Sequence, residues 1–326
     1  MDHPKVSVII PVYGVEKYIA RCARSLFGQT LDDIEFIFVN DCTPDNSIGV
    51  LREILEEYPR RKDWVTVYDH PVNRGLAVAR IDGIHLAKGE YIIACDSDDW
   101  VESTMYELMY NEAIRTDADI VGCDYLLEYG DRTETRRQDF TLGQTDMINE
   151  MLSGGKVEGY IWNRMVRRSF YVSNGFKAPE DVSLLEDMAV TVPMHLITEK
   201  VAYIGQPLYH YNRSNIGSLT AAKTIRSVNS ELKVFDMLAP MLSDTRFIDS
   251  YRQRLVSAIR PLLNKYETLD VDRWRRYGLD IPAHMFHERN YRMLRFLAVH
   301  NLKPLNRLMA WAHHLLCKAG IAHEHS

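Results

Sequence analysis

The chain has 326 residues, 46% apolar and 26% charged, a composition typical of a soluble globular protein with one large domain or two ordinary ones. Its formal net charge is −6, from 39 basic and 45 acidic residues, which excludes a nucleic-acid binder that relies on overall positive charge. Five scattered cysteines, no signal-peptide pattern and no apolar run near the roughly 20 residues of a membrane helix predict a cytoplasmic protein that does not span a membrane.

The first 125 residues alternate strand and helix patterns. Apolar, β-branched runs predict strands at residues 6–12, 34–39, 65–68, 91–95 and 120–126. Helical spacing predicts helices at residues 15–27, 48–58, 76–87 and 105–116. Asp45, Asn46 or Ser47 is available to cap the second helix, and Asn73 to cap the third. This alternation predicts a parallel sheet covered by helices on both faces.

The pattern loosens after residue 130. Short helices are predicted at residues 145–152 and 184–196, and a short strand, broken by Gly205 and Pro207, at residues 203–211. From about residue 225 the chain has an almost wholly helical pattern. We predict a catalytic domain over residues 1–222, with a nucleotide-binding half (about 1–125) and an acceptor half (about 126–222), then a helical C-terminal region over residues 223–326.

Polar side chains gather where the first four predicted strands end. They are Pro11, Tyr13 and Gly14, then Asn40, Asp41 and Thr43, then His70, Asn73 and Arg74, and finally Asp96, Asp98 and Asp99. Parallel strands end at the same edge of a sheet, and ligands of such sheets bind beyond that edge. The sequence therefore predicts a ligand site there.

Three carboxylates follow the strand at residues 91–95. Unpaired carboxylates at the end of a covered strand are costly to desolvate, so a cation is expected to meet them. Asp96 and Asp98 both reach one metal ion if the chain turns there, and oxygen ligands beside a phosphate suit Mg²⁺ or Mn²⁺. The alternative is that Asp98 or Asp99 caps the next helix, and Asp99 is the better candidate for a cap.

Three further positions leave two interpretations open. Asp41 suits a hydrogen bond to a base N–H or a ribose hydroxyl, or else turn chemistry. Arg80 lies in an apolar helix pattern, as a snorkelling surface group or as the partner of a phosphate or carboxylate. The Glu186-Asp187 pair begins an apolar helix, where the helix dipole favours acids, or supplies a general base for a hydroxyl proton.

Five motifs, in order, resemble those of the family 2 glycosyltransferases with the GT-A fold. They are Val-Ser-Val-Ile-Ile-Pro-Val-Tyr-Gly at residues 6–14, the segments 40–47, 73–83 and 88–100, and the Glu186-Asp187 pair. Any one motif is weak, but together they cover residues 5–215 at the family's spacing. The resemblance implies an α/β, Rossmann-like GT-A fold with a mostly parallel sheet, and a metal-dependent, hexosyltransferase-like enzyme.

The resemblance also implies roles for the polar residues of the sheet edge. Pro11 and Tyr13 match the segment that lines the nucleotide base, and Asp41 matches the acid that binds uracil or ribose. Asp96 and Asp98 match the metal-binding Asp-x-Asp motif, with Asp98 the better candidate for direct coordination of Mn²⁺ or Mg²⁺.

Later residues match the rest of the family's site. Arg80 matches an arginine near the nucleotide diphosphate, and Asp187 matches the catalytic base, with Glu186 beside it. The family also has a late Tyr-x-Arg…Ser element that closes over the donor phosphates. This chain resembles it at Tyr211, Arg213 and Ser218. For His210 a metal or phosphate contact and a packed histidine are both open, and the packed histidine is favoured.

Two positions depart from the family pattern. The family has Asp-Gly-Ser where this chain has Asp41-Cys42-Thr43, and Ile81 replaces the Asn after Arg80, so that Asn's contact is missing or comes from Asp82. Neither change touches the metal ligands or the base. The resemblance thus implies an active, inverting enzyme that moves a sugar from a nucleotide-sugar, UDP by family habit, to a glycan or lipid-linked acceptor in cell-surface polysaccharide synthesis.

Rival functions have weaker support in the sequence. A nucleotidyltransferase needs a Gly-rich basic loop after the first strand, where this chain has Tyr13-Gly14-Val15-Glu16-Lys17. A dinucleotide oxidoreductase needs Gly-x-Gly-x-x-Gly after a strand, and the sequence has none. A catalytically silent nucleotide-sugar-binding subunit is the remaining alternative, and intact Asp96, Asp98 and Asp187 argue against it.

The C-terminal residues 289–322 have a basic amphipathic pattern. They contain six Lys or Arg side chains and no acid, among many large apolar residues. Such a helix binds an anionic membrane surface, which suits a lipid-linked acceptor at the inner membrane. The alternative, which is favoured, is that the apolar face packs on the catalytic domain or on a second subunit in a homodimer.

Overall fold

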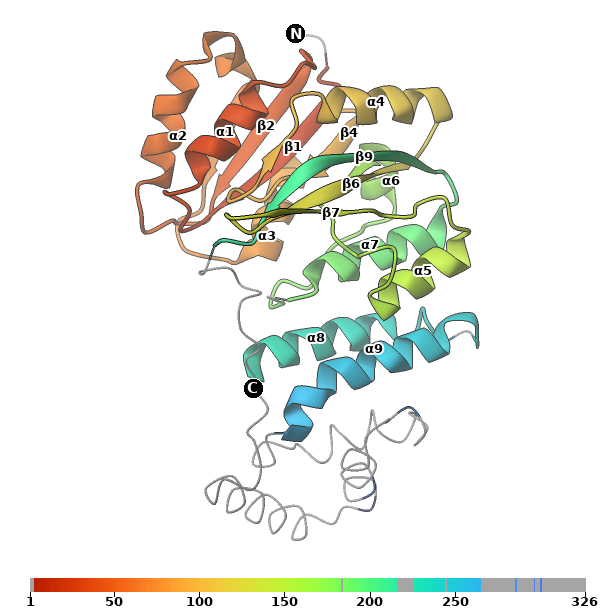
Figure 1. Ribbon diagram of the computed structural model, residues 1–326. Coiled ribbons are helices and arrows are strands. Elements are labelled where there is room, and N and C mark those ends of the chain that lie inside the picture. The colour runs from red at the N-terminus through yellow and green to blue at the C-terminus, as the bar shows by residue number, and fades with distance from the viewer. Residues whose placement is uncertain are drawn as a thin grey trace.

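The computed structural model describes residues 3–182, 184–215, 225–243 and 245–264, together with Met285, Phe296 and His300. Within them a central sheet is flanked by helices (Figure 1). The strands are β1 (Val6–Val12), β2 (Ile34–Asn40), β3 (Val65–Asp69), β4 (Tyr91–Ala94), β5 (Trp100–Val101), β6 (Ile120–Glu128), β7 (Thr133–Arg136), β8 (Arg164–Arg167) and β9 (Val201–Asn212). The helices are α1 (Ile19–Phe27), α2 (Ser47–Glu56), the 3-10 helix η1 (Pro59–Trp64), α3 (Leu76–Leu86), α4 (Met105–Thr116), α5 (Gln144–Ser153), α6 (Arg168–Ser173), α7 (Glu186–Ile197), α8 (Ile225–Leu238) and α9 (Thr245–Asn264).

The sheet has the order β3-β2-β1-β4-β8-β6-β9-β5, and β7 pairs with β6. Strands β1 to β4 are parallel, and β8 runs antiparallel to both β4 and β6. Since β8 is antiparallel to both of its neighbours, β6 runs in the same direction as β4 and β1. Strand β9 is parallel to β6 and therefore also runs in the direction of β1. The mostly parallel sheet is therefore confirmed, and the short strands β5, β7 and β8 are the ones that run the other way.

The five strands predicted before residue 130 are confirmed, with ends shifted by one or two residues at most. The predicted break at Gly205 and Pro207 is instead a pair of register shifts inside one long strand, β9. Asn73 is not the cap of α3, because Gly75 holds the N-cap position. In α2 the cap position is Asn46, but the carboxylate of Asp45 accepts the Ser47 N–H at 3.2 Å.

Both faces of the sheet are buried, because alternate residues of β1 enter two different cores. Val8 and Ile10 pack with α1, α2 and α4 on one face. Ile9 packs on the other face with α3, α5 and α7. This double cover explains why the strands read as continuous apolar runs rather than as alternating ones.

Helix α3 lies close against β1 and β2. A Cβ atom at Gly83 would lie 2.5 Å from Ile9 Cγ2 and 3.2 Å from Val39 Cγ2, so only glycine fits at this position without a shift. Arg80 lies about one turn earlier on the same helix. The close contact at Gly83 therefore fixes how far the Arg80 side chain reaches along the sheet edge.

Helices α8 and α9 lie side by side beyond α5 and α7, on the side away from the sheet (Figure 1). Phe235, Leu238, Phe247 and Tyr251 belong to the same hydrophobic core as Met147 and Val190 of α5 and α7. The predicted domain boundary at residue 222 falls outside the described residues and stays a prediction. No helix in the described part of the chain is long and apolar enough to cross a bilayer.

Candidate active site

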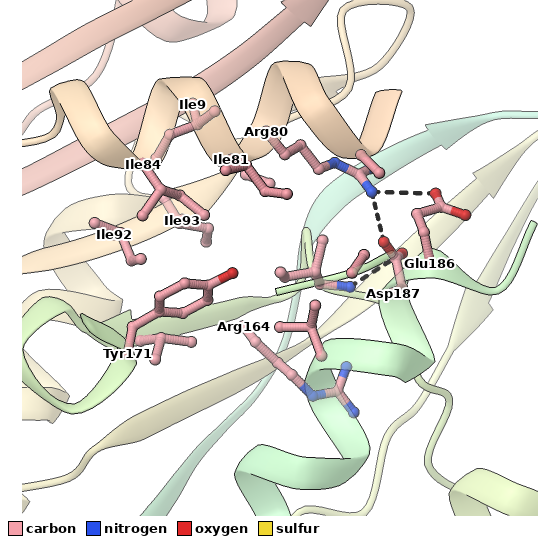
Figure 2. Close-up of a pocket in the computed structure, with 16 residues that line it drawn as sticks. Ile9, Arg80, Ile81, Ile84, Ile92, Ile93, Arg164, Tyr171, Glu186 and Asp187 are labelled. Atoms are coloured by element: carbon pink, nitrogen blue, oxygen red, sulfur yellow. Dashed lines mark hydrogen bonds and ion pairs between the residues drawn. The ribbon is translucent and has the colours of Figure 1, made fainter. Parts of the chain in front are cut away.

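Arg80 lies at the centre of the site and bonds three carboxylates, two of which, Glu186 and Asp187, are drawn in Figure 2. Its Nη2 donates to Asp96 Oδ1 at 2.7 Å, and its Nη1 lies 2.6 Å from Asp187 Oδ1 and 3.2 Å from Glu186 Oε1. Burial alone lowers the pKa of Arg80, but the three acids raise it well above its usual value. Of the two interpretations of Arg80, the carboxylate partner is therefore correct and the surface group is wrong.

The Glu186-Asp187 pair begins α7 and lies partly buried next to Arg80. Leu185, just before it, has a φ of 62°, in the left-handed region that non-glycine residues rarely adopt. This turn directs both acids toward Arg80, and the Ile161 N–H donates to Asp187 Oδ2 at 3.2 Å. Burial raises the pKa of Glu186 to about 7, helped by Asp187 and opposed by Arg80. Burial also raises the pKa of Asp187, again opposed by Arg80.

Replacing Glu186 by Gln is expected to flatten the pH dependence of stability. The pKa of Glu186 rises from 4.5 to about 7 on folding, so the folded state binds more protons than the unfolded state in this window. The free energy of unfolding therefore falls as pH rises through it, by up to about 1.4 kcal/mol per pH unit for one such group. Urea unfolding across this window measures the slope.

The control for this prediction is Glu53→Gln, at an exposed position of α2. It is expected to keep the wild-type slope. Asp98, Asp99 and Asp187 also have raised pKa values, so part of the slope remains in Glu186→Gln. Equal slopes in wild type and Glu186→Gln would contradict the assignment of the raised pKa to Glu186.

Asp98 is the less neutralised of the two predicted metal ligands. Its Oδ2 accepts a hydrogen bond from Asn215 Nδ2 at 2.8 Å, and burial followed by the charge of Asp96 raises its pKa. The charge of Arg21 lowers the pKa of Asp98 less than burial and Asp96 raise it, so the positive charge near Asp98 does not compensate the carboxylate, which fits a divalent cation. Within the described residues no group of three or more His, Cys, Asp or Glu side chains is arranged as a metal site. Two carboxylates nevertheless suit Mg²⁺ or Mn²⁺ when phosphate and water complete the shell.

Asp99 does not cap a helix, so that expectation is wrong. Its Oδ2 accepts the Tyr209 hydroxyl at 2.6 Å and its Oδ1 accepts the Asn212 N–H at 2.7 Å. Helix α4 begins later, after Thr104, because β5 follows Asp99 directly. Burial raises the pKa of Asp99 well above its usual value, with Asp98 and Asp96 adding to the effect. Asp99 thus joins the loop of the two predicted metal ligands to β9.

Asp41 holds the N-terminus of α3. Its Oδ1 accepts the Arg74 N–H at 2.7 Å and its Oδ2 accepts the Gly75 N–H at 2.8 Å. His70 Nδ1 lies 2.7 Å from Asp41 Oδ1, and His70 Nε2 lies 3.1 Å from Asp82 Oδ2. Asp41 therefore has a structural role at the end of β2, and a contact with a base or ribose stays a prediction.

Cys42 has a φ of 55°, which explains why the family pattern has glycine at this position. Pro11 is buried at the end of β1, whereas the Tyr13 side chain is 52% exposed beside this turn. Gly14 N–H donates to Thr43 Oγ1 at 2.8 Å, which ties the loops after β1 and β2 together. The predicted nucleotide-facing residues Pro11 and Tyr13 thus lie beside Asp41 at one edge of the sheet.

His210 is packed between neighbouring side chains, which is the alternative that the sequence favoured over a metal or phosphate contact. Its Nδ1 lies 2.7 Å from Glu128 Oε1, its Nε2 lies 2.9 Å from Glu102 Oε1, and its ring stacks on Trp100. Arg213 is exposed, with its Nη1 3.3 Å from the Tyr211 hydroxyl. Ser218 and the basic segment 289–322 lie outside the described residues, apart from Phe296 and His300.

Sequence reasoning missed two residues that organise the site. Arg164 is fully buried behind Asp187, and its guanidinium donates to the carbonyls of Glu158 and Tyr160. Tyr209 donates to Asp99 and also accepts the Asp96 N–H at 3.1 Å. The only signal for Arg164 was a basic residue after Trp162, and an aromatic residue in a strand gave none for Tyr209.

Comparison with known proteins identifies the family. The model for glycosyl transferase family 2 matches residues 7–173. EpsH of Bacillus subtilis, which is named as a glycosyltransferase, is 34% identical over 261 residues, or 78% of this chain and 74% of EpsH.

Solved structures show the same fold. TarS 1–349 of S. aureus in complex with UDP-GlcNAc has a TM-score of 0.68 at 17% identity, covering 95% of this chain and 92% of TarS. A mannosyltransferase of Pyrobaculum calidifontis in complex with GDP-Man and Mn²⁺ has a TM-score of 0.53 at 14% identity, covering 95% and 87%. The GT-A fold is thereby confirmed, and the chain belongs to the family 2 glycosyltransferases.

Proposed function

We propose that the protein transfers a sugar, with inversion, from a nucleotide-sugar to a hydroxyl group of a glycan or lipid-linked acceptor. The observation that carries the proposal is the Arg80 guanidinium, which bonds the metal-ligand candidate Asp96 and the base candidate Asp187 at 2.7 and 2.6 Å. Donor diphosphate and acceptor hydroxyl would then meet at one centre. A single displacement at that centre inverts the anomeric carbon.

Asp96 and Asp98 are the residues that would hold Mn²⁺ or Mg²⁺. The ion would supply positive charge against the diphosphate leaving group. The raised pKa of Asp98 supports a cation at this place, because burial and Asp96 both disfavour its charged form. The mannosyltransferase with bound Mn²⁺ also supports it, by likeness of fold.

Asp187 would take the proton of the acceptor hydroxyl. A general base must be ionised when the substrate arrives, and burial works against this. The Ile161 N–H and Arg80 Nη1 offset the burial, because both donate hydrogen bonds to the carboxylate. Glu186 bonds the same Nη1 group of Arg80 and partly neutralises the guanidinium charge. It would therefore act through Arg80 rather than on the acceptor.

The donor would lie along the sheet edge after β1 and β2. Tyr13 offers an exposed ring, and Asp41 lies next to it in the turn that carries Cys42. UDP is the favoured nucleotide, supported by TarS in its UDP-GlcNAc complex. Arg213 and Ser218 would close over the donor phosphates. We also propose a role in cell-surface polysaccharide synthesis. For residues 289–322, packing on the catalytic domain or on a second subunit in a homodimer is favoured over contact with the inner membrane surface.

Metal removal is expected to abolish turnover. In a thermal-shift panel of UDP-, GDP- and TDP-sugars, a UDP-sugar should raise the Tm with Mn²⁺ and much less after EDTA treatment. A ligand that binds only the folded state stabilises it by RT ln(1 + L/Kd), where L is its free concentration, so the rise in Tm at a fixed sugar concentration follows the affinity. Hydrolysis of the selected donor by the pure protein then tests catalysis.

The matched control adds back Mn²⁺ or Mg²⁺ after EDTA treatment and is expected to restore the Tm shift and the hydrolysis. Full activity in metal-free buffer would overturn the metal assignment. Donor binding without any hydrolysis or transfer would instead favour a catalytically silent binding subunit.

A further inference from the structure

A second buried arginine, Arg164, lies on the other side of Asp187 from Arg80 (Figure 2). Its side chain is fully buried, yet in the part of the chain that the structure describes it forms no ion pair. A buried charge without a bonded counter-charge is costly, so a compensating negative charge is expected nearby. Its guanidinium bonds neutral acceptors, which are the carbonyls of Glu158 and Tyr160, Asn163 Oδ1 at 2.7 Å and His195 Nε2 at 3.3 Å.

The compensating charge is that of Asp187. Burial lowers the pKa of Arg164 to about 9, and Asp187 is the largest of the charges that oppose this fall, so the guanidinium is still charged at neutral pH. In return, burial raises the pKa of Asp187, and Arg80 and, more weakly, Arg164 oppose that rise. The carboxylate therefore has two cations beside it, one that bonds it and one behind it.

Arg164 also reaches Asp187 through the backbone of residues 158–161, here called the strap. The Ile161 N–H, at the end of the strap, donates to Asp187 Oδ2 at 3.2 Å. This N–H and the Tyr160 carbonyl belong to one planar peptide group, so Arg164, which bonds the carbonyl, fixes the direction of the N–H. Hydrogen bonds in such a chain polarise one another. The peptide group therefore links the guanidinium directly to the carboxylate.

Helix α7 ties the strap and Arg164 to the proposed base. Thr191 and His195 follow Asp187 at intervals of four residues, so the three side chains share one face of the helix. Thr191 Oγ1 donates to the Gly159 carbonyl of the strap at 3.0 Å, and His195 accepts from Arg164. Burial lowers the pKa of His195 well below its usual value, which keeps it a neutral acceptor. The base, the strap and Arg164 therefore form one bonded unit.

We infer that Arg164 is a positioning residue for the proposed base: its charge and the peptide group that it bonds keep the Asp187 carboxylate ionised and fixed in place. The inference rests on the proposed function, since it assumes that Asp187 takes the acceptor proton. The other titratable groups around Asp187, which the variants below leave unchanged, are Arg80 of α3, Asp96 after β4, Glu186 of α7 and Tyr160 of the strap.

The main test compares Arg164→Lys with Arg164→Met, two side chains of similar length that differ in charge. The acid limb of the profile of kcat against pH reports the base, whose ionised form a nearby cation favours. We expect Arg164→Lys to keep the limb of wild type, and Arg164→Met to move it to higher pH by about one pH unit, with the UDP-sugar-dependent rise in Tm unchanged. The control Arg52→Met, at an exposed position of α2, is expected to match wild type. A purely structural role would lower kcat or stability without moving the limb, so equal limbs in the two Arg164 variants would overturn the inference.

A milder change tests the strap, and it decides the question if Arg164→Met does not fold. Thr191→Val keeps the size of the side chain but frees the Gly159 carbonyl, so kcat should fall about 3–10-fold, the usual effect of one hydrogen bond, at unchanged donor affinity. The control Thr116→Val removes a hydroxyl that likewise bonds the carbonyl four residues earlier, at an exposed position of α4, and should match wild type. Wild-type kcat in Thr191→Val would overturn the inference.

A titration without turnover separates this inference from the proposed function. The full chain is labelled with ¹³Cγ-aspartate, and the Asp187 signal is identified by its loss in Asp187→Asn. The midpoint of this signal should lie at higher pH in Arg164→Met than in Arg164→Lys, and equal midpoints would overturn the inference. Absence of sugar transfer by wild type would instead count against the proposed function.

Discussion

Replacing Asp187 by Asn is expected to lower kcat for sugar transfer by about 10²–10⁴-fold, the usual contribution of a general base. The amide has nearly the shape of the carboxylate but cannot accept the acceptor proton. Its oxygen still accepts a hydrogen bond from Ile161 N–H or Arg80 Nη1, the two donors that hold the native side chain. Donor binding is therefore expected to survive, as a UDP-sugar-dependent rise in Tm.

The controls for Asp187→Asn separate base chemistry from charge. Asp63→Asn, at an exposed position of η1, should leave transfer and stability unchanged. Glu186→Gln, which changes the charge beside Arg80 without removing the base, should lower kcat less than Asp187→Asn does. Near-normal turnover by Asp187→Asn would remove Asp187 from the base role.

Replacing Arg80 by Gln is expected to lower the free energy of unfolding by about 3–5 kcal/mol, the usual cost of leaving buried partners uncompensated. The Arg80 side chain is only 8% exposed, and its removal takes away the one cation that bonds Asp96, Glu186 and Asp187 in the described structure. Sugar transfer should fall to background, because both Asp96 and Asp187 lose the group that holds them. Urea unfolding and a transfer assay measure the two effects.

Two companion variants test the cause of the Arg80 effect. Arg80→Lys keeps the positive charge but loses the planar guanidinium, whose two Nη groups bond Asp96 on one side and Asp187 on the other. It should therefore retain more of the stability than of the activity. Arg80→Gln combined with Glu186→Gln should cost less stability than the sum of the two changes, because one of the stranded acids is neutral. Wild-type stability in Arg80→Gln would show that the three acids do not need this cation.

Local patterns were enough to predict much of the fold and the identity of the central acids. The apolar runs of β1 to β4 and the acids that follow them are neighbours along the chain, so the sheet edge and Asp96 were visible in the sequence. The family motifs added Arg80 and Asp187. The structure adds that these two residues contact each other, across 107 positions of sequence.

Contacts between distant segments account for what the sequence did not reveal. Asp99 was expected at a helix cap because its partners, Tyr209 and Asn212, lie more than 100 residues away. Asn73 looked like the cap of α3, but Gly75 is the N-cap, and the carboxylate of Asp41 binds the N–H groups of Arg74 and Gly75 just before the helix. Strand β8 has four residues, too few for a periodic pattern, although it joins the two halves of the sheet.

The separation of Arg80 from its acids along the chain has a consequence for the order of folding. Contacts across 106 and 107 residues close a long loop, and closing a long loop is slow. The strands β1 to β4 are linked by much shorter connections, so they can pair before α7 docks. Until α7 arrives, Asp96 and Arg80 can form only their own local pair. We therefore expect the proposed catalytic centre to form only after α7 docks, and a ribosome-bound chain that ends before Glu186 lacks two of the three acids that Arg80 bonds.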